Sequence, residues 1–161
     1  MIFKSKHADL PIPDSDLCSV VLSRAEELGD KPALIDGLSG RKLSYSELAR
    51  QTRHFAAGLD RRGFKKGDVF ATFMPNVPEY AVVFLGVAAV GGINTTVNSL
   101  YSTSDLVHQF TDSGARFLLT VPDFLDRALP AASPTAYKKH WLIPLLQRYF
   151  ISLRMSCRLC P

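Results

Sequence analysis

Residues 69–121 carry the pattern that decides the fold: VFATFMPNVPEYAVVFLGVAAVGGINTTVNSLYSTSDLVHQFTDSGARFLLTV. Apolar or β-branched runs begin at Val69, Ile93 and Phe117, 24 residues apart, and each has the length of a strand. Helical patterns fill the intervals at 76–90 and 102–113, and glycines follow both. This alternation predicts an α/β fold with parallel β-α-β-α-β order and helical crossovers. Because the strands are apolar on both faces, we expect helices to cover the sheet on both sides.

Capping signals predict where the helices begin. Ser44 and Glu47 form a capping-box pattern, so a helix should run to about Arg62. Its buried face should contain Leu48, Thr52, Phe55, Ala56 and Leu59. Ser102 and Asp105 repeat the signal, and Gly114 should close that helix. Pro122 should open a short helix through Leu129.

The amino-terminal region predicts one helix and a hairpin after an extended opening segment. Helical spacing covers 17–28 and Gly29 should end that helix, whose apolar face would contain Leu17, Val20, Val21, Ala25 and Leu28. Strands are expected at 33–36 and 42–44, with a glycine-containing hairpin loop between them.

Composition and charge exclude several classes of protein. The 161 residues suit one globular domain, and no apolar run reaches the roughly 18 residues of a membrane-spanning helix. The net charge is +4, but residues 1–137 carry −1, so this part gives no reason to expect nucleic acid as a partner. The polar opening is unlike a secretory signal, and three cysteines are too few for a disulfide scaffold. We therefore expect a cytoplasmic protein.

Five motifs in order resemble a known family. They are LSYSEL (43–48), GDV (67–69), MPNVPE (74–79), LGVAAVGG (85–92) and NTTVN (94–98). Over residues 2–131 the chain resembles the amino-terminal part of adenylate-forming acid–CoA ligases, and the opening IFKSK (2–6) looks most like the 4-coumarate–CoA ligase group. The resemblance implies an incomplete large domain of that fold. It also implies, for full-length members, an acid that reacts with ATP to give acyl-AMP and then with coenzyme A.

The family motifs that hold nucleotide are not found in this sequence. No Ser/Thr/Gly-rich phosphate loop ending in Pro-Lys-Gly occurs, and no glycine follows Gly114. The aromatic-Gly-x-Thr-Glu motif, the ribose-binding Asp, the hinge acid and the Lys of the small mobile domain are also missing. We therefore assign no catalytic, cofactor-binding or metal-binding residue to this chain. ATP, magnesium and coenzyme A are implied only for the full-length family.

Several residues are candidates for a site, and most of them also have a simple structural explanation. Thr95, Thr96 and Asn98 follow a predicted parallel strand, where α/β proteins bind ligands, although a simple turn explains them as well. Tyr45 and Glu47 are explained by helix capping and packing. Gly91 and Gly92 are explained as the end of a helix. Residues 65–68 (KKGD) are typical of a solvated turn. The isolated histidines show no metal-ligand spacing: His7, His54, His108 and His140. Cys18 is expected in the core, and Cys157 with Cys160 is at best half a zinc site.

The last residues depart from the family pattern. We divide the chain into a partial ligase region at 1–132 and a basic, apolar tail at 133–161. The tail has helical spacing at Leu142, Leu145, Leu146, Tyr149 and Leu153. It could be a basic amphipathic helix at a membrane surface, or a non-family end created by a shifted reading frame, alternative splicing or a gene-model error.

Three functions follow as hypotheses. The chain is a truncated acid–CoA ligase that is inactive alone, a binding or decoy module that docks on a full-length ligase, or a protein that contacts membranes through its tail. An incomplete sheet would leave an exposed edge and an uncovered apolar face, and both favour association.

Overall fold

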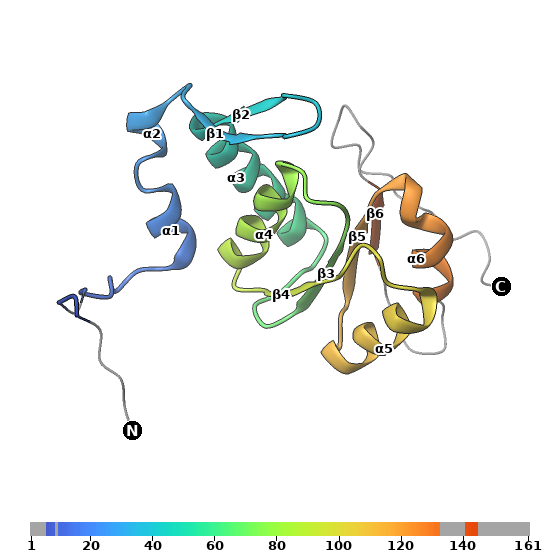
Figure 1. Ribbon diagram of the computed structural model, residues 1–161. Helices are drawn as coiled ribbons and strands as arrows, with labels where there is room; N and C mark the ends of the chain where they lie inside the picture. The colour runs from blue at the N-terminus through green and yellow to red at the C-terminus, as the bar shows by residue number, and fades with distance from the viewer. Residues whose placement is uncertain (1–5, 9, 133–140, 145–161) are drawn as a thin grey trace.

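Parallel strands from residues 69–121 form the centre of the computed structural model (Figure 1). The structure describes residues 6–8, 10–132 and 141–144. The main sheet has the strand order β4-β3-β5-β6, and all three pairings are parallel. Its strands are β3 (Val69–Phe73), β4 (Ile93–Thr96), β5 (Phe117–Thr120) and β6 (Trp141–Pro144). The predicted α/β fold with β-α-β-α-β order is therefore confirmed.

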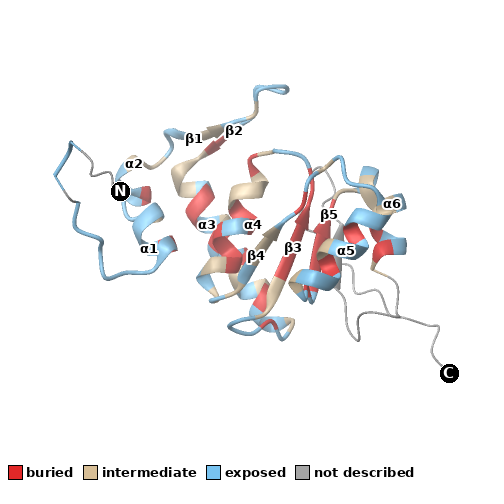
Figure 2. Cartoon of the chain, turned by 60° about the horizontal axis from the view of Figure 1, so that its bottom comes forward, coloured by how far each residue is buried: buried red, intermediate tan, exposed pale blue. Residues whose placement is uncertain are grey.

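Helices cover both faces of the central strands (Figure 2). On one face lie α3 (Tyr45–Arg61) and α4 (Glu79–Ala89), which pack with Phe70 and Phe117. On the other lie α5 (Thr103–Ser113) and α6 (Leu125–Ala131), which pack with Ala71, Phe73 and Leu118. Neighbouring residues of a strand point to opposite faces, so a strand covered on both sides is apolar throughout. The expected uncovered apolar face is thus not present at β3 and β5.

The strand β4 differs from its neighbours because it lies at an edge. Its residues are half-buried or exposed, with Ile93 53% exposed, whereas those of β5 are all buried. The prediction that every strand is apolar on both faces is therefore wrong for β4. An edge strand contacts the core on one flank only, so it tolerates the polar residues Asn94, Thr95 and Thr96.

An aromatic cluster fills the space between the sheet and α3. Phe70 and Phe117 lie opposite each other in the register with ring centroids 6.3 Å apart, and Phe64 meets Phe117 edge-on at 5.0 Å. Phe55 of α3 approaches Phe70 edge-on at 5.8 Å. Each buried ring contributes about 1.5–3 kcal/mol through burial, so this cluster fixes α3 on the sheet.

The helix caps agree with the local signals. Both capping boxes are present, with the side chains of Ser44 and Ser102 accepting from the backbone N–H groups of Glu47 and Asp105. Gly114 ends α5 in the left-handed conformation, and the 3₁₀ turn η1 (Pro122–Phe124) leads into α6. The start of α4 was predicted three residues too early, because a residue before proline, here Val77, is disfavoured in helical conformation.

The amino-terminal helix differs from its prediction. The pattern at 17–28 forms two short helices, α1 (Leu17–Leu22) and α2 (Ala25–Leu28). Ser23 Oγ donates to the Val20 carbonyl, and Arg24 leaves helical geometry. This local competition for backbone groups explains the break.

The apolar residues at helical spacing in this region are only partly buried, whereas the core position predicted for Cys18 is confirmed. Leu17, Val20 and Val21 are exposed, whereas Cys18 and Ala25 are buried. The reason is tertiary, because α1 packs against α4 and the Cys18 thiol donates to the Leu85 carbonyl at 2.9 Å. The hairpin is confirmed, with β1 (Pro32–Ile35) antiparallel to β2 (Lys42–Ser44).

Part of the predicted tail belongs to the sheet. Residues Trp141–Pro144 form β6 and pair with β5, so the helical prediction is wrong for these four residues. The free edge of β5 offers unpaired backbone groups, and Pro144 is compatible with an edge strand. The other tail residues lie outside the described part of the chain, so the origin of the tail, a membrane-binding helix and the boundary at 132 stay predictions.

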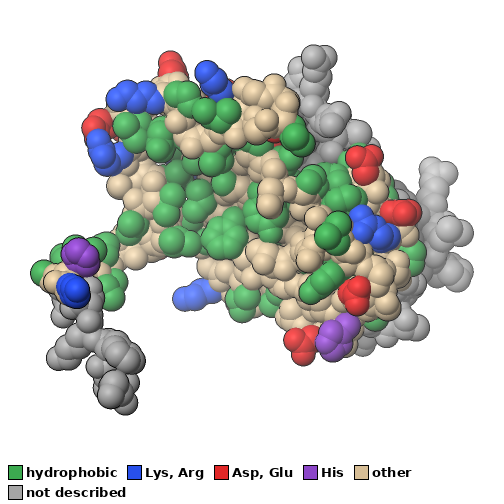
Figure 3. Space-filling model, viewed as in Figure 1, with side chains coloured by type: hydrophobic (Ala, Val, Ile, Leu, Met, Phe, Trp, Pro, Cys, Tyr) green, Lys and Arg blue, Asp and Glu red, His purple; other side chains and the backbone are tan. Residues whose placement is uncertain are grey.

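The face shown in Figure 3 has few charged side chains at its centre. Hydrophobic side chains gather over α4, and most charged ones lie toward the periphery. No helix among the described residues is long and apolar enough to cross a bilayer.

The close contact at Gly92 generates a testable prediction. A Cβ atom at this position would lie 2.4 Å from Cε1 of Phe64 and 2.8 Å from Cγ1 of Val87, and both side chains are fully buried. We expect Gly92→Ala to lower the free energy of unfolding by about 1–3 kcal/mol through overpacking. Urea denaturation measures this difference.

The matched control is Gly37→Ala. A Cβ atom on Gly37 would have no neighbour within 4 Å. We expect its free energy of unfolding to stay within about 0.5 kcal/mol of the parent. Equal stability of the two variants would contradict the packing described here.

Candidate functional site

The carboxyl ends of the parallel strands are the place where α/β proteins usually bind ligands. Three predicted candidates lie there: Thr95, Thr96 and Asn98. The Gln109 side-chain amide donates to Thr95 Oγ1 at 2.9 Å and to the Thr96 carbonyl at 3.0 Å. Asn98 Oδ1 accepts from the Leu100 N–H at 3.0 Å. These groups therefore hold a turn and its attachment to α5, in agreement with the simpler interpretation.

Arg127 anchors the loop that follows β4, a role that no sequence motif indicates. Its Nη1 atom donates to the carbonyls of Ser99 at 2.9 Å and Tyr101 at 2.8 Å. Its guanidinium lies 5.1 Å from the ring centroid of Phe73 and 4.6 Å from that of Phe124. A cation held between two rings and two carbonyls is fixed in place. This basic side chain is therefore engaged with protein groups.

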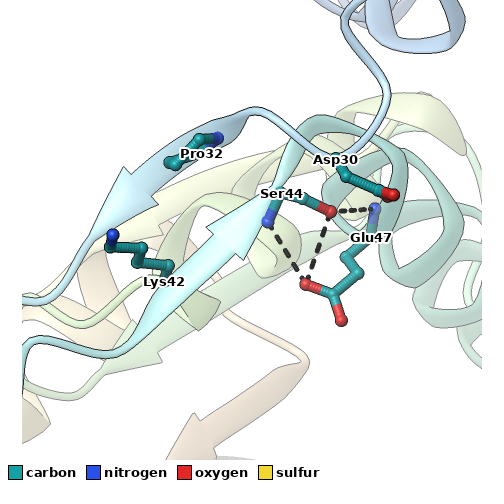
Figure 4. Close-up of a pocket in the computed structure, with 5 residues that line it drawn as sticks. All are labelled: Asp30, Pro32, Lys42, Ser44 and Glu47. Atoms are coloured by element: carbon teal, nitrogen blue, oxygen red, sulfur yellow. Dashed lines mark hydrogen bonds between the residues drawn. The ribbon is translucent and has the colours of Figure 1, made fainter.

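A shallow open hollow lies at the start of α3, lined by Asp30, Pro32, Lys42, Ser44 and Glu47 (Figure 4). The Glu47 carboxylate accepts from the Ser44 N–H at 3.2 Å as part of the capping box. Asp30 accepts from the Ser46 hydroxyl at 3.2 Å. Both carboxylates thus hold local structure, so the capping role predicted for Glu47 is confirmed.

The glycine pair and the charged turn lie against each other. Gly91 has φ +72°, and its carbonyl accepts from the Gly67 N–H at 2.9 Å, which joins the end of α4 to the turn at 65–68. Lys65 and Lys66 are exposed, as a solvated turn requires. Asp68 differs, because it forms an ion pair with Arg116 and its side chain is only 11% exposed. The turn is therefore tied to the start of β5.

Histidines and cysteines do not form a site in the described residues. His7, His54 and His108 are exposed on separate segments, and no three potential metal ligands come together in the described ranges. His140, Cys157 and Cys160 lie outside those ranges. Cys18 is buried, and burial raises the pKa of its thiol, so it stays protonated and packs as a small core residue, as predicted.

One ion pair joins the hairpin to the helical layer. Arg41, after the hairpin loop, binds both carboxylate oxygens of Glu79 at the start of α4, and Arg41 Nη2 lies 2.8 Å from Glu79 Oε2. The Glu79 side chain is 18% exposed. The Arg41 guanidinium lowers the pKa of the Glu79 carboxyl, against the opposing effect of burial. This pair is structural, because the guanidinium of Arg41 donates to both oxygens of the Glu79 carboxylate.

The chain matches a described family and several curated proteins. The family described as "AMP-binding enzyme" matches residues 22–147. The chain is 39% identical over 121 residues to 4-coumarate–CoA ligase 3 of Oryza sativa subsp. japonica, covering 74% of this chain and 22% of that protein. It is 35% identical over 127 residues to 4-coumarate–CoA ligase of Pinus taeda, covering 78% and 24%. It thus spans about a quarter of the length of these relatives.

Solved structures share the fold at lower sequence identity. A luciferase-like enzyme of Zophobas morio superposes with a TM-score of 0.82 at 15% identity, covering 91% of this chain and 35% of that chain. A long-chain-fatty-acid–CoA ligase of Archaeoglobus fulgidus gives 0.78 at 22% identity, covering 88% and 30%. These likenesses establish the fold, of which the present chain covers a part.

The Arg41–Glu79 pair predicts how stability changes with pH. A carboxyl with a lowered folded-state pKa stabilises the fold above its unfolded pKa of about 4.3, and this contribution is lost as the pH falls through the folded value. We expect Glu79→Gln to lower the free energy of unfolding by about 1 kcal/mol at neutral pH, because Arg41 is half exposed and water screens the pair. The difference from the parent should shrink in acid, which urea titrations across the acid range measure.

Glu26→Gln serves as the control, since Glu26 is exposed on α2. We expect this variant to follow the stability of the parent at all pH values. If the free energy of unfolding of Glu79→Gln stayed equally far below that of the parent in acid, the ion pair would not be the cause of the difference.

Proposed function

The chain belongs to the family of AMP-binding enzymes, and from this premise we propose that it supplies scaffold for an ATP-dependent acid–CoA ligase of the 4-coumarate–CoA ligase type. Such a ligase joins an acid to AMP with release of pyrophosphate and then transfers the acyl group to coenzyme A. The proposal rests on the match over residues 22–147 together with the resemblance of the motifs between residues 43 and 98.

The single observation that favours a scaffold role is that polar groups at the strand ends form hydrogen bonds within the protein. Gln109 engages Thr95 and Thr96, and Arg127 engages the loop carbonyls. A site that binds phosphates needs amides and cations directed at the ligand, because these groups must offset the charge of the phosphates. In the described ranges we find no such convergent set, so the residues present do not fit a nucleotide.

We propose accordingly that ATP, magnesium and coenzyme A bind elsewhere in a full-length ligase of this family. The described residues would position the sheet and its helices, and the chemistry would come from other segments. On this basis the 161-residue chain is inactive by itself. The cytoplasm remains the proposed compartment, since three cysteines are too few for a disulfide scaffold.

A second candidate function is a binding module that docks on a full-length ligase or on another chain. The exposed position of β4 at the edge of the sheet favours this alternative. It would use the same fold without any catalytic step.

The scaffold proposal predicts the outcome of an activity assay. We expect the purified chain to release no pyrophosphate above background when supplied with ATP, magnesium, 4-coumarate and coenzyme A. Calorimetry should likewise detect no saturable binding of ATP. The reason is the missing set of groups that would offset phosphate charge.

The full-length 4-coumarate–CoA ligase 3 of Oryza sativa serves as the positive control in the same assay. Sustained turnover by the 161-residue chain, or tight saturable uptake of ATP, would refute the proposal. Thr96→Val would then test whether the strand ends take part after all.

A further inference from the structure

The charges of this chain are distributed unevenly. Residues 50–66, which include most of α3 and the turn after it, contain six Lys or Arg and one Asp, a net charge of +5. Since residues 1–137 together carry −1, the remainder of that part carries −6. A surface on which one sign of charge dominates attracts partners of the opposite sign. The small net charge therefore hides a basic segment within an acidic body.

One side of α3 presents this positive charge to water. Arg50, His54 and Arg61 follow one another at intervals of four and seven residues, which places them on one side of a helix. Arg53 lies next to His54 in the same exposed region, and all four side chains are exposed. The opposite side of α3 is buried against the aromatic cluster, so the helix is fixed with its cations outward.

The turn after α3 extends the basic surface. Phe64 is buried in the aromatic cluster, and its N–H donates to the Leu59 carbonyl at 3.1 Å. The Lys65 N–H donates to Asp68 Oδ2 at 2.8 Å, while the Lys65 side chain is exposed. The backbone is therefore held on both sides of an exposed cation. We call this surface the basic face and define it by Arg50, Arg53, His54, Arg61 and Lys65.

Contacts within the fold do not account for these cations. The ion pairs found in the described ranges join other residues and include no member of the basic face. The acids of α3 are Glu47, which the capping box holds, and Asp60. The helix dipole stabilises a cation in the last turn, which explains Arg61 but not Arg50 or Arg53. The charges of Arg50 and Arg53 are thus available to a partner.

Exposed acidic side chains are concentrated on the other face of the sheet. Figure 3 shows acidic side chains over α5 and α6. Four exposed aspartates lie in this layer: Asp105, Asp112, Asp123 and Asp126. The charge of the molecule is therefore separated across the sheet, with cations over α3 and acids over α5 and α6. An anionic surface would attract the first side and repel the second, and so would orient the molecule.

We propose that the basic face binds the surface of a membrane that contains anionic phospholipids. The negative potential at such a surface attracts Lys and Arg, and clusters of these residues on an amphipathic helix are typical of this contact. The orientation follows from the charge separation, with α3 toward the headgroups and the α5–α6 layer away from them.

The side chains of the basic face favour lipid over other anionic partners. Protein interfaces are anchored by large side chains that become buried, whereas Ala57 is the one apolar residue that the described helix α3 exposes. Single-stranded nucleic acids stack on exposed aromatic rings, but Phe55 and Phe64 are both buried. A duplex is read by a helix that enters its major groove, whereas α3 lies along the sheet against α2 and α4. Headgroup charge attracts cations without any of these features.

Co-sedimentation of the full 161-residue chain with vesicles tests the proposal. The vesicles consist of phosphatidylcholine alone or of phosphatidylcholine mixed with phosphatidylserine. We expect binding only where phosphatidylserine is present, and weaker binding at higher salt, which screens the charges. Each Lys or Arg near the surface strengthens binding about fivefold, so Lys65→Gln should lower the partition coefficient by about that factor. Arg50→Gln/Arg53→Gln should lower it roughly tenfold or more.

The matched control is Val107→Glu/Thr111→Glu on α5. It lowers the net charge by the same two units as Arg50→Gln/Arg53→Gln, but at exposed positions on the opposite face of the sheet. We expect its partition coefficient to stay within about twofold of the parent, because salt screens charges beyond about 10 Å. Circular dichroism of each variant should match that of the parent. The cations beyond residue 137 are the same in every variant, so the differences report on the basic face.

Equal binding of Arg50→Gln/Arg53→Gln and the parent would overturn the proposal, because the cations beyond residue 137 would then account for the contact. Binding of equal strength to vesicles of phosphatidylcholine alone would also overturn it, as would no binding to either kind. An oligonucleotide that displaces the chain from the vesicles at the same salt concentration would assign the basic face to nucleic acid instead. The test needs neither ATP nor coenzyme A, so its result is independent of the function proposed above.

Discussion

The pairing of β3 with β4 on one side and β5 on the other is the constraint on which the rest of the structure depends. These parallel ladders place Phe70 and Ala71 on opposite faces, and both are fully inaccessible to water. Parallel strands need helical crossovers, so the pairing requires α4 and α5 to return across the sheet. The helices then cover the two faces, and the core follows from this geometry.

The same geometry explains why polar groups near the strand ends form hydrogen bonds within the described part of the chain. Short crossovers leave loops at the strand ends, and nearby polar groups hold these loops in place through hydrogen bonds. Gln109 fastens the end of β4, while Arg127 fastens the next loop from a helix that lies beyond β5. Membership in a ligase family is therefore compatible with a segment that is wholly structural.

The helix α4 shows the difference between the two sides of this fold. Its buried side meets α3 and the sheet, and its outer flank carries Phe84 next to an edge strand without charge. Helices α3 and α5 instead expose charged residues such as Arg50 and Asp112.

The sequence by itself determined the features that depend on neighbouring residues. Two capping boxes predicted where helices start, namely Ser44 with Glu47 and Ser102 with Asp105. A capping box needs only two residues that are three positions apart in the chain. The spacing of the apolar runs predicted the parallel sheet for a similar reason, since strand and crossover lengths are local. The motifs at 43–98 carried the family resemblance in the same way, as a matter of order along the chain.

Only the tertiary structure decided the contacts between distant segments. In the amino-terminal region, the packing of α1 against α4 left Leu17, Val20 and Val21 exposed although their spacing is helical. The strand β6 formed where helical spacing was expected, since β5 offered an open edge. The Arg127 anchor and the Asp68–Arg116 pair join residues 26 or more positions apart, which no local pattern encodes. Their energies depend on distances in space, and those exist only once the sheet has formed.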